Sequence, residues 1–219
     1  MKRVVVIGLG IFGFNIAKAL FEGGLEVIAI DKDKDIVQHI RDFSTKAVVA
    51  DATDTEVLES VGIQPEDVAI ISFGEDLAAA SLITLHLREM KVHNIIVKVP
   101  NEDYKKVLEK VGATEIIIPE KEMASKVARS LISPNVIDFI PLSGDYTICE
   151  MAPPSVFYGK TLGELHLRAR YHIDVIAVKE ILSDQVRMVP RADYMIKDTD
   201  VLIVIGKERD IAKVPGKSE

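Results

Sequence analysis

The stretch Val4-Val5-Val6-Ile7-Gly8-Leu9-Gly10-Ile11-Phe12-Gly13 decides the fold of this chain. Its β-branched residues predict a strand, and the Gly-x-Gly-x-x-Gly pattern predicts a tight turn into a helix. Gly8 ends the strand sharply, Gly10 leaves room for a pyrophosphate beside the backbone, and Gly13 lets the helix lie close to the sheet. The helix N-terminus adds unpaired N–H groups that favour an anion. The stretch therefore predicts a dinucleotide-binding turn.

A second apolar strand, over residues 26–30, ends at Asp31. An acid at the end of the second strand of such a unit hydrogen-bonds the ribose hydroxyls of NAD or of an adenosine. A helix N-cap and a solvated loop acid are the alternative roles for Asp31. A carboxylate here repels a 2′-phosphate and so disfavours NADP, although Lys32 beside it weakens the repulsion.

The order of the predicted elements indicates an α/β fold with a doubly wound parallel sheet. Six apolar strands alternate with helices as far as residue 118, and the strands are continuous apolar runs, as expected when helices cover both faces of a sheet. The ligand crevice is then expected at the carboxyl ends of the first, second and fourth strands. A further helix is predicted over 120–133.

The alternation of strands and helices stops near residue 135. Short strands near 138–142, 147–151 and 201–205, a hairpin over 173–181 and 186–190, and a short helix over 162–167 predict a small α+β domain. We therefore expect a nucleotide-binding Rossmann domain over 1–134, which includes the helix after Pro119, and a second domain over 135–219.

Composition limits the classes of partner. The chain has 219 residues, 48% of them hydrophobic and 28% charged, which is typical of a globular protein with an ample core. A net charge of −7 argues against nucleic acid as the main partner. The single cysteine, Cys149, excludes an intramolecular disulfide and a cysteine-based zinc site, and it fits a reducing cytoplasm. We expect neither a signal peptide nor direct membrane insertion, so that any membrane role goes through a partner.

These residues together resemble the RCK/KTN family, the cytosolic nucleotide-binding regulatory subunits of Trk and Ktr potassium transport systems. The first half matches in the glycine turn, Asp31-Lys32-Asp33, Ala50-Asp51-Ala52-Thr53-Asp54, Lys98, Val111-Gly112-Ala113 and Pro119-Glu120-Lys121-Glu122-Met123-Ala124. The second half resembles the family's regulatory TrkA-C domain in Gly159-Lys160-Thr161-Leu162, Arg168, Asp174-Val175-Ile176-Ala177-Val178, Asp200 and Gly206.

The resemblance implies a site for NAD(H) or for an adenine nucleotide (AMP, ADP or ATP). The implied residues are Gly8, Gly10, Ile11, Phe12 and Gly13 at the phosphates, Asp31 and Lys32 at the ribose, Asp51, Ala52 and Thr53 at the adenine end, Ser72, Phe73 and Gly74 on the far side, and Lys98 reaching toward phosphate. Lys98 is alternatively a surface lysine. Ile11 stands where many relatives have an arginine, which argues against ATP-specific triggering.

The resemblance further implies a homodimer or a higher ring that gates a membrane-embedded Trk- or Ktr-type potassium pore subunit, with this chain in the cytoplasm and peripheral to the inner membrane. Glu120 would help to bind a divalent cation between subunits; its alternative is a first-turn glutamate favoured by the helix dipole. Some relatives bind cyclic di-AMP between paired C-terminal domains, at a segment like Leu167-Arg168. Asp174 replaces an asparagine of those relatives, and simple surface charge is the alternative for Arg168.

An NAD-dependent oxidoreductase is the alternative function, because a Rossmann domain serves both classes. Such an enzyme needs a proton donor or acceptor beside the nicotinamide. The five histidines form no recognisable catalytic motif, and neither a Tyr-x-x-x-Lys pair nor a metal-ligand cluster is present in the sequence. We therefore expect a sensor without catalytic residues.

Overall fold

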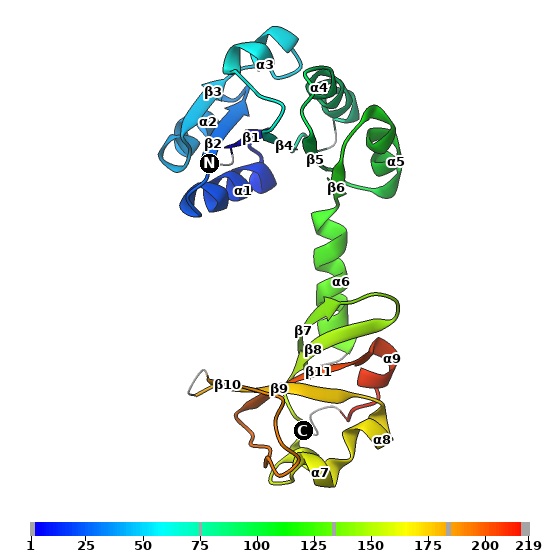
Figure 1. Ribbon diagram of the computed structural model, residues 1–219. Coiled ribbons are helices and arrows are strands. Elements are labelled where there is room, and N and C mark those ends of the chain that lie inside the picture. The colour runs from blue at the N-terminus through cyan, green and yellow to red at the C-terminus, as the bar shows by residue number, and fades with distance from the viewer. Residues whose placement is uncertain (1–2, 75, 133–134, 183–184, 216–219) are drawn as a thin grey trace. The chain divides into compact units, whose positions relative to one another are not determined.

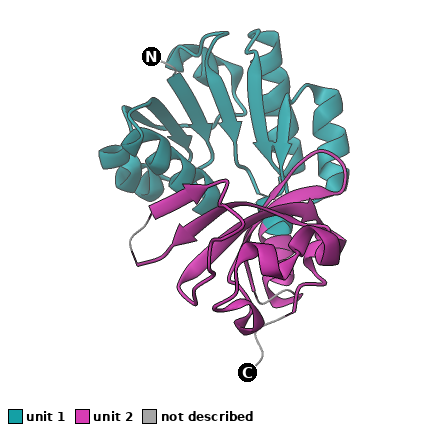
Figure 2. Ribbon diagram, turned by 60° about the horizontal axis from the view of Figure 1, so that its bottom comes forward, with its two compact units in different colours: residues 1–122 teal, residues 123–219 magenta. Residues whose placement is uncertain are grey.

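The computed structural model describes residues 3–74, 76–132, 135–182 and 185–215. The chain divides into two compact units, residues 1–122 and 123–219, and the division falls inside helix α6 (Pro119–Ile132) (Figure 2). The boundary expected at residue 134 falls outside the described residues and stays a prediction. None of the helices in the described ranges is both long enough and apolar enough to cross a membrane.

The first unit is the expected doubly wound sheet (Figure 1). All six strands are parallel, in the order β3-β2-β1-β4-β5-β6. In chain order its elements are β1 (Arg3–Ile7), α1 (Ile11–Glu22), β2 (Glu26–Asp31), α2 (Lys34–Ile40), the 3₁₀ turn η1 (Arg41–Phe43), β3 (Lys46–Val49), α3 (Thr55–Val61), β4 (Val68–Ile71), α4 (Leu77–Glu89), β5 (Asn94–Lys98), α5 (Glu102–Val111) and β6 (Glu115–Ile117). The fold-class prediction is confirmed.

Helices cover both faces of this sheet. Val4 and Val6 of β1 pack in one core with buried residues of α1 and α2, and Val5 and Ile7 pack in another with buried residues of α3, α4 and α5. Successive side chains of a strand point to opposite faces, so the continuous apolar run of β1 fills both cores. Strand order reverses on either side of β1, where adjacent crossovers run to opposite faces. In folds of this kind the ligand crevice lies at such a point, here the carboxyl ends of β1 and β4.

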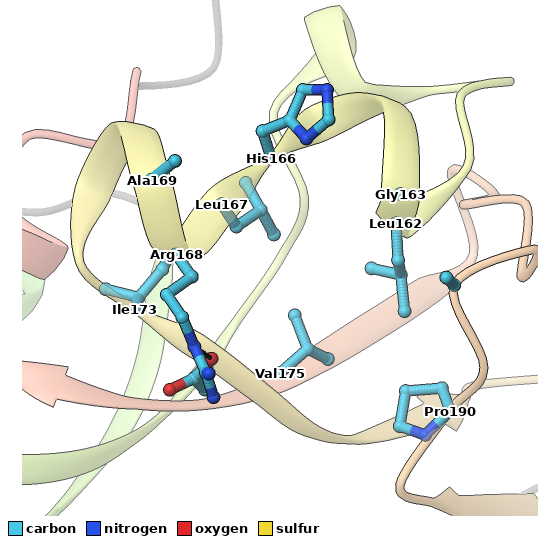
Figure 3. Close-up of a pocket in the computed structure, with 11 residues that line it drawn as sticks. Leu162, Gly163, His166, Leu167, Arg168, Ala169, Ile173, Val175 and Pro190 are labelled. Atoms are coloured by element: carbon cyan, nitrogen blue, oxygen red, sulfur yellow. Dashed lines mark hydrogen bonds and ion pairs between the residues drawn. The ribbon is translucent and has the colours of Figure 1, made fainter.

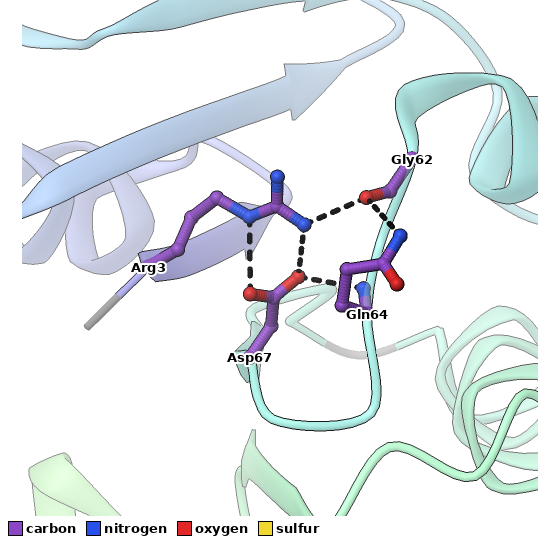
Figure 4. A network of polar contacts seen from close by, with 4 residues as sticks. All are labelled: Arg3, Gly62, Gln64 and Asp67. Atoms are coloured by element: carbon purple, nitrogen blue, oxygen red, sulfur yellow. Dashed lines mark hydrogen bonds and ion pairs between the residues drawn. The ribbon is translucent and has the colours of Figure 1, made fainter. Parts of the chain in front are cut away.

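A polar network joins the amino end of β1 to the loop before β4 (Figure 4). The Arg3 guanidinium donates to both carboxylate oxygens of Asp67, at 3.0 and 2.6 Å, and also to the carbonyl oxygen of Gly62 at 2.6 Å. Asp67 is 3% exposed and accepts a further hydrogen bond from the backbone N–H of Gln64. The hydrogen bond to Asp67, together with the charge of that carboxylate, raises the pKa of Arg3. The network lies at the opposite end of the sheet from the crevice, which makes it structural.

We expect Arg3→Lys to lower the free energy of unfolding by about 1 kcal/mol, because lysine keeps the charge but loses the planar fork that holds both oxygens of Asp67. Urea unfolding of the full chain measures the change. Arg41→Lys is the matched control, since among the described residues Arg41 makes one exposed hydrogen bond, to Gln38. Equal midpoints for the two variants would contradict the structural role of the network.

The second unit is an antiparallel sheet with short helices, as expected. Its strand order is β10-β9-β11-β8-β7. After α6, the elements are β7 (Val136–Pro141), β8 (Tyr146–Met151), the 3₁₀ turn η2 (Ser155–Phe157), α7 (Leu162–Leu165), α8 (Leu167–Tyr171), β9 (Asp174–Glu180), β10 (Gln185–Met188), β11 (Asp200–Lys207) and α9 (Glu208–Ile211). The helix expected over 162–167 is interrupted at His166, whose φ of +47° is left-handed.

Cys149 of β8 lies in the core of this second unit and is fully buried. Burial raises the pKa of its thiol to about 12. We expect Cys149 to resist maleimide at pH 8 in the folded protein and to react fully once urea unfolds the chain, because only the thiolate attacks. Mass spectrometry of the labelled protein reads the result. Rapid labelling without urea would show that β8 opens readily.

Candidate functional site

Two glycines of the β1–α1 turn are required by their own neighbours. Gly8 has a φ of +88°, and a Cβ built on it would lie 2.5 Å from the carbonyl oxygen of Ser72 at the end of β4. A Cβ on Gly13 would overlap the carbonyl oxygen of Gly8. The turn is therefore compact because neither position carries a side chain. This compactness brings the first residues of α1 close to the end of β4.

Gly10 is different, because nothing in the part of the chain that the structure describes requires a glycine there. Its φ of −60° and ψ of −174° suit any residue, and no other heavy atom lies within 4 Å of the position a Cβ would take. Open space next to the backbone is what a pyrophosphate needs in order to approach.

Helix α1 starts at this turn without a side-chain cap. Gly10 is its N-cap, and the first turn contains no acidic residue. Helices α2 to α5 are instead capped by Asp33, Asp54, Asp76 and Asn101. The first N–H groups of α1 and the positive end of its dipole are therefore available to an anion.

Asp31 lies beside the same turn, at the end of β2. One carboxylate oxygen accepts a hydrogen bond from the backbone N–H of Leu9 at 2.6 Å, and the other accepts from that of Asp33 at 2.9 Å. These bonds fix the carboxylate next to the glycine turn, and each oxygen keeps a second lone pair for a ribose hydroxyl. The helix-cap alternative is wrong, because the cap of α2 is Asp33.

Asp51 forms the outer part of the site, after β3. Its carboxylate accepts hydrogen bonds from the hydroxyl of Thr53 at 2.7 Å and from the backbone N–H of Thr53 at 3.0 Å. These bonds, with a smaller contribution from the charge of Lys32, lower the pKa of Asp51. Ala52 is buried and Asp51 is exposed. Asp31 ends β2 and Asp51 follows the neighbouring strand β3, so the two acids lie on the side of the sheet where the parallel strands end.

The segment Ser72-Phe73-Gly74 closes the other side of the turn. The backbone N–H of Ser72 donates to the carbonyl oxygen of Ile7 at 2.8 Å, which extends the pairing of β1 with β4. Phe73 packs against the core of α3, α4 and α5, and Gly74 has a φ of +58°. The structure thus brings the glycine turn, Asp31 and Ser72 together.

Lys98 and Glu120 form an ion pair at the end of β5. The ammonium lies 2.6 Å from the carboxylate, and the side chain of Lys98 is 13% exposed while that of Glu120 is 64% exposed. The hydrogen bond from Lys98 and a backbone hydrogen bond lower the pKa of Glu120. In this arrangement Lys98 is engaged by a protein acid. Within the described ranges, no three potential ligands of the His, Cys, Asp or Glu type gather at one place.

The second unit has a pocket of about 550 Å³ between α7, α8 and β9 (Figure 3). Leu162, Val175 and Pro190 supply apolar walls, and Arg168 extends over it. The Arg168 guanidinium lies 2.6 Å from the carboxylate of Asp174, which raises the pKa of Arg168. Reasoning from the sequence singled out Arg168 and Asp174 but missed Leu162, Val175 and Pro190 as walls. Those three residues come from α7, β9 and the segment after β10, so only the tertiary packing places them together.

The comparisons with known proteins agree with this architecture. The TrkA-N domain family matches residues 4–119, and the TrkA-C domain family matches residues 147–214. The Ktr system potassium uptake protein C of Bacillus subtilis is 41% identical over 97% of this chain and 95% of its own length. The Ktr system potassium uptake protein A of the same organism is 37% identical over the same shares, and that of Vibrio alginolyticus is 32% identical over 96% and 95%.

Two solved structures share the fold across the whole chain. The GsuK channel aligns with a TM-score of 0.66 at 18% identity over 40% of its own chain, and the GsuK RCK domain aligns with 0.62 at 18% over 48%. At this identity the likeness concerns the fold alone. The sequence matches carry the assignment: this chain belongs to the family of Ktr and Trk potassium uptake proteins built from a TrkA-N and a TrkA-C domain.

Proposed function

We propose that this protein is a cytoplasmic, nucleotide-binding regulatory subunit of a potassium uptake system. The observation that carries the proposal is the near full-length similarity to Ktr potassium uptake proteins, combined with an open phosphate approach at Gly10 beside the fixed carboxylate of Asp31. The ligand in the crevice is NAD(H) or an adenine nucleotide. The subunit acts on a membrane-embedded pore partner of the Trk or Ktr type and lies peripheral to the inner membrane through that partner.

The crevice residues support a particular division of roles. The N–H groups at the start of α1 receive the pyrophosphate, Asp31 and Lys32 lie at the ribose, Asp51 to Thr53 lie at the adenine end, and Ser72 to Gly74 form the far wall. Lys98 reaches a phosphate only when its contact with Glu120 opens.

Gating requires that the ligand prefer one assembly state over another. The described part of α6 has no buried residue, and the spaced apolar side chains Met123, Val127, Leu131 and Ile132 are half or more exposed. Such a stripe suits contact with a neighbouring subunit in a homodimer or ring. Nucleotides with different affinities for two arrangements of the ring would then shift the pore between open and closed populations.

A divalent cation fits this site only in part. Glu120 offers a single carboxylate, which Lys98 already neutralises, and Mg²⁺ in nucleotide sites is held by one or two carboxylates together with phosphate oxygens. Glu120 would therefore hold a cation together with nucleotide phosphates and a residue of a neighbouring subunit.

The decisive experiment is a calorimetric titration of the full chain with NAD, NADH, NADP, AMP, ADP and ATP, each with and without Mg²⁺. We expect micromolar binding of at least one adenine nucleotide and none of NADP. Asp31→Asn should weaken that binding about tenfold, because the neutral amide loses the charged acceptor for the ribose. Glu26→Gln, at the other end of the same strand, is the control. No binding of any nucleotide would overturn the proposal.

An oxidoreductase is the alternative that the experiment must separate from a sensor. The fold is compatible with both classes, whereas the named relatives are potassium uptake proteins. We infer that the chain is not an enzyme. Turnover of NAD(H) with any small alcohol, aldehyde or keto acid at ordinary enzymatic rates would contradict this inference.

A cyclic dinucleotide is a second ligand, proposed for the pocket of Figure 3. A charged Arg168 above apolar walls suits a phosphate flanked by bases, whereas Asp174 opposes it by engaging the guanidinium. Arg168→Gln should abolish binding of cyclic di-AMP while Arg191→Gln leaves it unchanged. Absence of binding by the unaltered chain at about 100 μM would exclude the ligand.

A further inference from the structure

A second pocket in the second unit lies apart from the one in Figure 3. It is formed by the turn between β7 and β8, the end of β11, the start of α9 and the side chain of Arg129 from α6, and its volume is about 670 Å³. We call it the hairpin pocket. Besides Arg129, its polar lining comprises Asp145, Tyr146, Thr147, Lys207, Glu208 and Arg209. This volume falls in the range of small-ligand sites.

Positive charge outweighs negative charge in the hairpin pocket, although the chain as a whole is acidic. Arg129 and Glu208 largely neutralise each other, because the guanidinium nitrogen lies 3.4 Å from the carboxylate. Neither Lys207 nor Arg209 forms an ion pair with any residue of the described ranges. Asp145 is the acid that opposes them, and the nearby Asp210 is bonded to Lys213 at 2.6 Å. Within the pocket lining, these two cations therefore face one acid, and outside the lining the charge of Arg209 also acts on the carboxylate of Asp210.

An aromatic ring stands next to these cations. Tyr146 and Lys207 are cross-strand partners in β8 and β11, and the Lys207 ammonium lies 5.4 Å from the centroid of the tyrosine ring. Half of Tyr146 is exposed (51%), and Pro141, Gly144 and Ala212 complete an uncharged wall. An anion held by Lys207 thus lies within reach of a surface on which a flat ring can stack.

We propose that the hairpin pocket binds a nucleoside monophosphate, with the phosphate on Lys207 and Arg209 and the base against Tyr146. Paired basic donors favour a phosphate, and the aromatic and apolar wall favours a ligand that carries a base over a bare anion. The site is independent of the crevice in the first unit, so neither proposal depends on the other.

The test measures ligand binding at the hairpin pocket itself, through the chemical reactivity of Lys207. The full chain is labelled with an amine-reactive acetylating reagent, with and without about 5 mM AMP, and the label on each lysine is quantified by peptide mass spectrometry. We expect AMP to slow labelling of Lys207 at least about fivefold, while exposed Lys160 is unaffected. Binding of AMP in the crevice of the first unit does not by itself protect Lys207, so the two sites give separate signals.

Two variants and one second probe complete the test. Arg209→Gln and Tyr146→Leu should each raise the AMP concentration needed for half protection about tenfold, because the first removes a phosphate donor and the second the stacking ring. Arg191→Gln is the control for the first. Inorganic phosphate should protect far less than AMP. The proposal is overturned by unprotected Lys207, by equal protection from phosphate alone, or by protection that both variants retain.

Discussion

Gly10→Ala should leave the stability of the chain unchanged and weaken binding of adenine nucleotides about 30-fold, because only the ligand needs the missing Cβ. The backbone of Gly10 suits alanine, and the added methyl meets no protein atom. In a complex, the same methyl would occupy the space through which the pyrophosphate approaches the N–H groups of α1. Calorimetric titration with NAD and ADP, together with thermal unfolding without ligand, measures both quantities.

Gly13→Ala provides the contrast. Its methyl would overlap the carbonyl oxygen of Gly8, so helix α1 must move away from the turn. We expect this variant to lose about 2 kcal/mol of stability as well as its nucleotide binding. Gly24→Ala is the comparison variant. Gly24 lies beyond the end of α1 with a φ of +83°, and its added methyl would meet no described atom, so this variant measures the cost of backbone strain without a steric clash. Unchanged affinity in Gly10→Ala would mean that phosphate does not pass over this turn.

The fold of the first unit could be predicted from the sequence because short, local patterns of residues specify its strands and its glycine turn. The apolar runs of β1, β2 and β4 are continuous, so they identify strands buried on both faces, and Gly8 and Gly13 mark the turn. The order of strands and helices then fixes which strand ends meet at the crevice. For this reason Asp31, at the end of β2, could be predicted as a site residue from the pattern, whereas the family resemblance supplied Ser72, which follows β4 on the other side of β1.

Contacts between side chains of different helices and strands could not be predicted from local sequence patterns. The ion pair between Lys98 and Glu120 depends on where the first turn of α6 lies relative to the end of β5, and no sequence spacing encodes that placement. His166 separates α7 from α8 in a left-handed conformation. A glycine at this position would have predicted the break, whereas a histidine does not. The two pockets described above in the second unit join residues from separate strands and loops, so only the packing creates them.

We expect the identity of residue 11 to decide which nucleotide the turn prefers. Ile11 is the first residue of α1, and 89% of its surface is exposed. The turn from Gly8 to Gly13 contains no cation, and Lys98 is held by Glu120. We therefore expect the dipole of α1 to provide most of the positive potential, which would suffice for a pyrophosphate but would give a third phosphate no partner.

Ile11→Arg is accordingly expected to raise the affinity for ATP relative to AMP about tenfold, because a guanidinium at the helix start can reach the terminal phosphate. Titrations with ATP, ADP and AMP at low and at moderate salt measure the ratio, which should shrink as salt screens the exposed charge. Ile11→Gln is the matched control, since it adds hydrogen-bonding capacity without charge.

An unchanged ratio in Ile11→Arg would place the terminal phosphate away from residue 11. The preference among adenine nucleotides would then have to come from Lys98, once released from Glu120, and the double variant Ile11→Arg, Glu120→Gln would reveal that contribution as an additional gain for ATP.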